Sequence, residues 1–128
     1  MPASGSQTRA SVLLVEEELF EREDIGRYLT KNGFEVVDVA DSDAAIATLE
    51  SRPEIRAVVT DAHVPGGTDG FSFAQLVRER WPHIAVIMMS GHSDASSGPI
   101  PDGGEFVAKS YLLEHLAPTL RRMLQGTR

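Results

Sequence analysis

The chain contains no cysteine, so disulfide bonds and thiolate chemistry are excluded. It has no apolar run of about eighteen residues, which argues against a membrane-spanning helix. Basic residues are few: 12 Lys and Arg stand against 19 Asp and Glu, and the net charge of −7 argues against DNA as a direct partner, because phosphate binding needs a basic face. The first seven residues lack the apolar core of a signal peptide. These absences predict a cytoplasmic protein that binds neither DNA nor a membrane.

The length and composition are those of one globular domain. A chain of 128 residues can bury a hydrophobic core, and contents of 41% hydrophobic and 24% charged residues are ordinary for a folded chain. We expect residues 1–10 to form a flexible tail and residues 11–125 to form the folded domain.

Short apolar runs alternate with segments of helical spacing. Runs such as Val12 to Val15 are rich in β-branched residues and fit strands covered on both faces. By this pattern, we predict five strands, at residues 12–15, 35–39, 55–61, 84–89 and 105–108. Strands that alternate with helices indicate an α/β fold with a doubly wound parallel sheet, right-handed crossovers and helices on both faces. The predicted strand order is 2-1-3-4-5.

The helices are marked by their caps and breakers. One runs from about Leu19 to Asn32 and stops at Gly33, a second is capped by Asp41 or Ser42, and a third is capped by Asp69. Residues 91–104 hold three glycines and two prolines after Gly91, so we predict a loop or at most two turns in place of a regular fourth helix. A last amphipathic stripe over 113–124 contains Pro118, so this helix either is kinked or begins near Pro118.

Polar side chains follow the predicted strands at one edge of the sheet. Asp61 ends the third strand, Glu16 and Glu17 follow the first, Ser90 follows the fourth and Lys109 follows the fifth. Converging carboxylates either hold a hard cation or repel one another. A carboxylate can attack phosphorus, Mg²⁺ needs one or two carboxylates together with phosphate oxygens, and an ammonium or a hydroxyl can donate to the remaining oxygens. The set therefore predicts phosphoryl-transfer chemistry.

Taken together, these residues resemble the receiver domain of two-component response regulators, which has a flavodoxin-like fold. The resemblance covers roughly residues 11 to 125. It is carried by four motifs in order: Val12 to Glu18, Thr60 to Gly66, Met89 to His92 and Phe106 to Lys109.

The resemblance implies a role for each residue. Asp61 would accept a phosphoryl group from a histidine kinase or a phosphotransfer protein. Mg²⁺ would be held by Glu17 directly, by Glu16 in the outer sphere, by Asp61 and by the main-chain carbonyl of His63. Ser90 and Lys109 would bond the phosphoryl oxygens, and Phe106 would reorient when Ser90 moves. Such a domain is not an enzyme in its own right, and it would signal to a downstream protein by contact.

The chain departs from the family pattern at three places. Glu17 stands where aspartate is usual, and Mg²⁺ tolerates little distortion of its octahedral shell, so its affinity is in question. Ser110 replaces the proline that usually follows the lysine, and because a cis bond before serine costs about 2.5–4 kcal/mol, we expect a trans bond and a shifted Lys109. The third departure is the irregular segment 91–104.

Plainer interpretations remain open for several of these residues. The acids from Glu16 to Glu18 could be a solvated helix start, and Ser90 could be a helix cap. His63 and His92 either are solvated or tune the access of hydrolytic water. For the whole chain, one alternative is a receiver-fold binding module that phosphate does not switch, because Glu17 and Ser110 spoil the site. A more distant one is an aspartyl-nucleophile phosphatase, although His63 stands where such enzymes usually carry a second acid.

Overall fold

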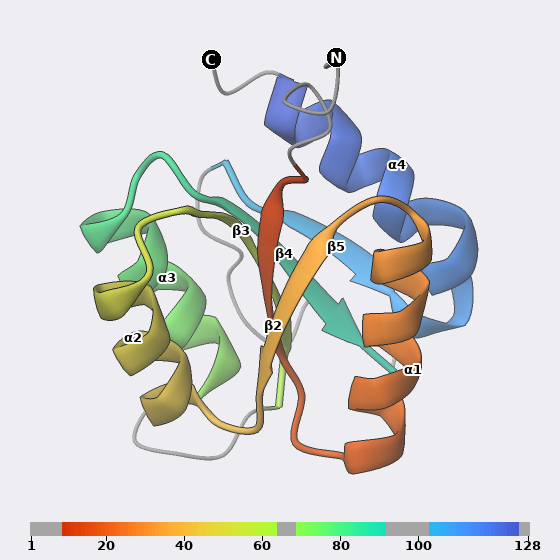
Figure 1. Cartoon of the computed structure of the whole chain (residues 1–128). Helices are drawn as coiled ribbons and strands as arrows, with labels where there is room; N and C mark the ends of the chain where they lie inside the picture. Colours follow the sequence, from red (N-terminus) through yellow and green to blue (C-terminus); the bar gives the residue numbers. More distant parts are fainter. Residues whose placement is uncertain (1–8, 64–68, 92–102, 126–128) are drawn as a thin grey trace.

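Five parallel strands form a single sheet in the computed structural model, which describes residues 9–63, 69–91 and 103–125 (Figure 1). The order is β2-β1-β3-β4-β5, so the predicted fold class and strand order are confirmed. The strands are β1 (Ser11–Val15), β2 (Glu35–Val39), β3 (Ile55–Asp61), β4 (Ala85–Ser90) and β5 (Glu105–Ala108). The fourth strand lies one residue later than predicted. The N-terminal tail is almost wholly outside the described residues, so the domain boundary stays a prediction.

Helices cover both faces of the sheet (Figure 1). They are α1 (Leu19–Lys31), α2 (Ser42–Ser51), α3 (Gly70–Arg80), the short 3₁₀ helix η3 (Lys109–Tyr111) and α4 (Leu112–Gln125). Alternate strand residues point to opposite faces, which divides the core in two. Leu14 and Val59 pack with α1 and α4, whereas Leu13 and Val58 pack with α2 and α3. Every helix in the described ranges is too short or too polar to span a lipid bilayer.

The helix ends follow the local chemistry of the sequence. Asp41, one of the two predicted caps, accepts a hydrogen bond from the amide of Ala44 at 2.8 Å, and Asp69 accepts one from Ser72 at 2.8 Å. Gly33 ends α1 with φ of 94°, in the left-handed region that favours glycine. The predicted irregular segment after Gly91, with His92, lies outside the described residues and is not tested.

Pro118 lies inside α4, which begins at Leu112, so the alternative that this helix starts near Pro118 is wrong. The hydroxyl of Tyr28 donates to the carbonyl of Leu113 at 3.2 Å and accepts from the amide of Ala117 at 2.9 Å. An uninterrupted helix would pair that carbonyl and that amide with each other. Tyr28 from α1 thus bonds to two backbone groups of α4 just before the proline.

Candidate functional site

Lys109 lies at the centre of the charged group at the carboxyl edge of the sheet. It follows β5 directly, and its Nζ is 2.9 Å from Oδ2 of Asp61 and 3.0 Å from Oε1 of Glu16. Asp61 ends β3 and Glu16 follows β1, so the ends of three strands, the adjacent β1 and β3 and the edge strand β5, each supply one charged group. Both carboxylates are largely buried, with side chains 11% and 3% exposed. The edge that the sequence predicts to hold these three residues therefore does hold them.

Glu21 is a fourth member of the group that the sequence analysis missed. Its Oε1 lies 3.0 Å from Nζ of Lys109, and its side chain is 47% exposed. Among the described residues, Glu16, Glu21 and Asp61 form a group in which one carboxylate oxygen from each residue lies within 4.8 Å of the other two. A sequence signal did exist: Glu21 precedes the buried Ile25 by four residues, so it lies on the core-facing stripe of α1, where an acid is unusual.

The acidic loop after β1 is held by backbone contacts. Oε2 of Glu16 accepts a hydrogen bond from the amide of Glu18 at 3.1 Å. Arg22, one turn into α1, donates from Nη1 to the carbonyl of Glu16 at 2.8 Å and to that of Glu17 at 3.3 Å. The side chain of Glu18 caps α1 by accepting from Glu21 at 2.8 Å. These contacts fix Glu16 toward Lys109, whereas Glu17 is exposed and is not one of the three clustered acids.

Burial and hydrogen bonding act in opposite directions on the pKa values of Glu16 and Lys109. Burial, together with the nearby charge of Asp61, raises the pKa of Glu16 despite hydrogen bonds from Glu18 and Lys109 that would lower it. Burial alone would lower the pKa of Lys109, but its hydrogen bonds to Asp61, Glu16 and Glu21 outweigh that effect and raise it above the usual lysine value. The side chain of Lys109 is therefore protonated and positively charged beside Asp61.

Backbone contacts fix the turn that follows Asp61. Oδ1 of Asp61 accepts from the amide of His63 at 3.1 Å, and the amide of Ala62 donates to the carbonyl of Met89 at 2.8 Å. Gly70, the first residue of α3, lies so close that an added Cβ would be 2.4 Å from the carbonyl oxygen of Ala62. The side chain of His63 is exposed, and its proposed carbonyl ligand role is not tested.

The remaining predicted residues lie around the same edge. Ser90 is buried at the end of β4, opposite Ala108 of β5. Phe106 is half-buried and packs on the side of the sheet covered by α2 and α3. The bond between Lys109 and Ser110 is trans, as expected for serine, and the lysine reaches Asp61 from this backbone.

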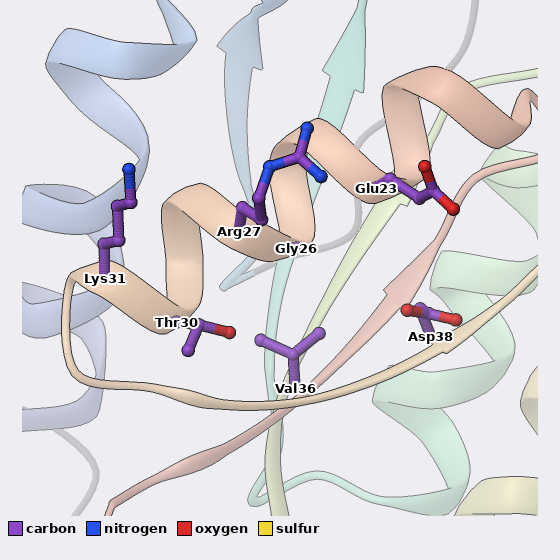
Figure 2. A pocket seen from close by; sticks show the side chains of 7 residues that line it. All are labelled: Glu23, Gly26, Arg27, Thr30, Lys31, Val36 and Asp38. Atoms are coloured by element: carbon purple, nitrogen blue, oxygen red, sulfur yellow. The ribbon is translucent and has the colours of Figure 1, made fainter.

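A groove lies away from this site, between α1 and the edge strand β2. Figure 2 shows that Glu23, Arg27 and Lys31 from α1 and Val36 and Asp38 from β2 lie along it. The groove is open and its charges are of both signs. It therefore offers no convergent set of groups comparable to the one around Lys109.

The sequence of this chain matches a known family of protein domains. The family model of the response regulator receiver domain matches residues 12–116, which include Glu16, Asp61, Ser90 and Lys109. The chain belongs to this family.

Relatives of this receiver domain are parts of longer regulators and kinases. The chain is 32% identical over 125 residues to the hydrogenase transcriptional regulatory protein HoxA of Cupriavidus necator, covering 94% of this chain and 25% of HoxA. It is 33% identical to the sensor kinase CckA of Brucella abortus, covering 95% of this chain and 13% of CckA. The chain thus spans about a quarter of the length of HoxA and less of CckA.

A solved structure matches the receiver domain over almost its entire length. The response regulator receiver protein from Sinorhizobium medicae is 28% identical and superposes with a TM-score of 0.83, covering 94% of this chain and 98% of that one. Receiver domains typically bind Mg²⁺ through acidic residues, and the carboxylate oxygens of Glu16 and Asp61 are the hard donors that this ion prefers.

Proposed function

We propose that Asp61 is the phosphoacceptor of this receiver domain, and that its donor is the phosphohistidine of a histidine kinase or of a phosphotransfer protein. In the transfer, an Oδ of Asp61 forms a bond to phosphorus while the bond between phosphorus and the imidazole nitrogen breaks. The electron pair of that bond stays on the imidazole, and Asp61 becomes an acyl phosphate. The observation that carries the proposal is the 2.9 Å contact between Lys109 and Asp61 at the carboxyl end of β3.

The neighbouring groups have separate roles in the proposed step. Lys109 neutralises charge on the phosphoryl oxygens, and the hydroxyl of Ser90 donates to one of them. Mg²⁺, when bound, would neutralise the same oxygens. Asp61 and Glu16 would hold the ion together with Glu17 and the main-chain carbonyl of His63, although Glu17 is exposed and lies outside the cluster of three acids.

The phosphorylated state would be transmitted by contact with a partner protein. The acyl phosphate would favour one of two arrangements of Ser90 and Phe106, and the face around β4 and β5 would present the change. Residues 11–125 would act as a signalling module in the cytoplasm, free-standing or within a longer chain, without an enzymatic reaction of their own and without direct contact with DNA or a membrane.

Acetyl phosphate with Mg²⁺ gives a direct test. The intact protein should gain the mass of one phosphoryl group by mass spectrometry, and Asp61→Asn should gain none. Asp61→Asn changes the charge but hardly the shape of the side chain, so a gain that survives this substitution would place the acceptor elsewhere.

A second candidate function is a receiver-fold binding module that phosphate does not switch. The exposure of Glu17, away from the clustered acids, favours it. Glu17→Asp and Ser110→Pro, assayed in the same way, separate the two. If wild type gains no mass while Glu17→Asp does, the unswitched module is the better description.

A further inference from the structure

Glu21 is the most exposed of the three carboxylates that contact Lys109, and it makes the site more negative than the predicted residues alone. Its side chain is 47% exposed, against 3% for Glu16 and 11% for Asp61. With Glu21 included, three carboxylates surround one ammonium. An oxygen of Glu21 also lies within 4.8 Å of an oxygen of Asp61, so its charge stands next to the nucleophile.

The contacts of Lys109 leave none of its hydrogens for an incoming group. An ammonium has three N–H donors. Lys109 has three acceptors, Asp61 at 2.9 Å and both Glu16 and Glu21 at 3.0 Å. A phosphoryl oxygen that arrives at Asp61 can take a hydrogen bond from Lys109 only if one acceptor gives way, and Glu21 is the one that solvent can reach.

We propose that Glu21 restrains phosphoryl transfer to Asp61 from free anionic donors, by holding Lys109 and by placing a negative charge at the mouth of the site. The inference rests on the proposed function. A small donor dianion meets this charge at close range, where like charges repel appreciably even in water. Glu21 is thus a positioning and selectivity residue, because it acts through Lys109 and through its field on the approaching donor.

Glu21→Gln removes the charge and keeps the shape of the side chain. With acetyl phosphate, Asp61 forms a bond to phosphorus and the electron pair of the broken bond leaves with acetate. This reaction should be on the order of tenfold faster in Glu21→Gln than in wild type. Phosphoramidate carries a smaller net negative charge, so the acceleration should be smaller with it. Glu21→Lys should extend the acetyl phosphate series in the same direction.

The matched control is Glu23→Gln, which makes the same change on the same helix. Glu23 lies along the groove beside β2 instead of at Lys109 (Figure 2). This variant should phosphorylate at the wild-type rate. Added salt should speed the reaction of wild type with acetyl phosphate, because it screens like charges, and should change that of Glu21→Gln less. A structural role alone would not depend on donor charge or salt.

The outcomes are distinguishable. Equal rates for wild type and Glu21→Gln, or equal acceleration with both donors, would overturn this inference and leave the proposed function intact. A slower Glu21→Gln with weaker Mg²⁺ binding by calorimetry would make Glu21 a metal ligand, which also overturns it. If no variant gains mass at Asp61, the proposed function and this inference both fail.

Discussion

At the scale of single residues, Gly70 allows the start of α3 to lie against the turn that carries Asp61. A Cβ at this position would be 2.4 Å from the oxygen of Ala62 and 2.6 Å from that of Asp61, and both are backbone atoms that cannot rotate away. Gly70→Ala should therefore lower the free energy of unfolding by about 1–3 kcal/mol or more, measured by urea denaturation. It should also slow phosphorylation of Asp61, because the turn must shift.

Gly26 is the matched control for this substitution. It lies inside α1, and an added Cβ would meet nothing within 4 Å. Gly26→Ala should raise the free energy of unfolding by roughly 0.5–1 kcal/mol, because alanine loses less backbone entropy in a helix. A loss of stability in both variants would show that the close approach at Gly70 is not the cause.

The residues at the charged edge were predictable to different degrees. Asp61, Glu16 and Lys109 could be brought together from the sequence, because parallel strands direct their carboxyl ends to one edge. Glu21 could not be placed in this way, since it belongs to a helix and its contact depends on how the first turn of α1 faces β5. The side-chain direction of Glu17 was equally outside the reach of the strand pattern.

At the scale of helices and strands, Tyr28 joins α1 to α4 at the residue before Pro118. Its hydroxyl pairs with both the carbonyl of Leu113 and the amide of Ala117. Tyr28→Phe should lower the free energy of unfolding by about 0.5–1.5 kcal/mol, because it removes the hydroxyl that bonds from α1 to two backbone groups of α4. Tyr111→Phe is the control, since Tyr111 is 56% exposed, and it should change stability little. A Tyr28→Phe variant as stable as wild type would rule out a contribution from the bridge.

The elements themselves were largely set by local chemistry. The largely buried strand β3 follows an apolar run, whereas the edge strands β2 and β5 are only partly buried and carry acidic residues. All three strands begin and end at the predicted residues. The proline in α4 was harder, because sequence alone left a kink and a later start equally open. The contacts that this helix makes with Tyr28, which lies 85 residues before Leu113 in the chain, are not visible in the local pattern.

At the scale of the whole molecule, the charged edge makes stability depend on pH in a particular direction. The pKa of Glu16 is raised by burial and by Asp61. A group whose pKa rises on folding contributes stability that is present below its ordinary value of 4.5 and lost as the pH rises through the folded value. The carboxylate of Glu16 therefore opposes folding near neutral pH, which is a common property of functional sites.

Glu16→Gln should consequently be more stable than wild type near neutral pH, and its advantage should shrink as the pH falls toward 4.5. Urea denaturation at a series of pH values, with a chelator present, measures this difference without any contribution from Mg²⁺. At Glu105, stability should depend on pH in the opposite direction, because the hydrogen bond with Arg122 lowers the pKa of Glu105. Glu105→Gln should be slightly less stable than wild type at neutral pH, and the difference should vanish in acid. Lower stability of Glu16→Gln at neutral pH would mean that its bond with Lys109 outweighs the burial of its charge.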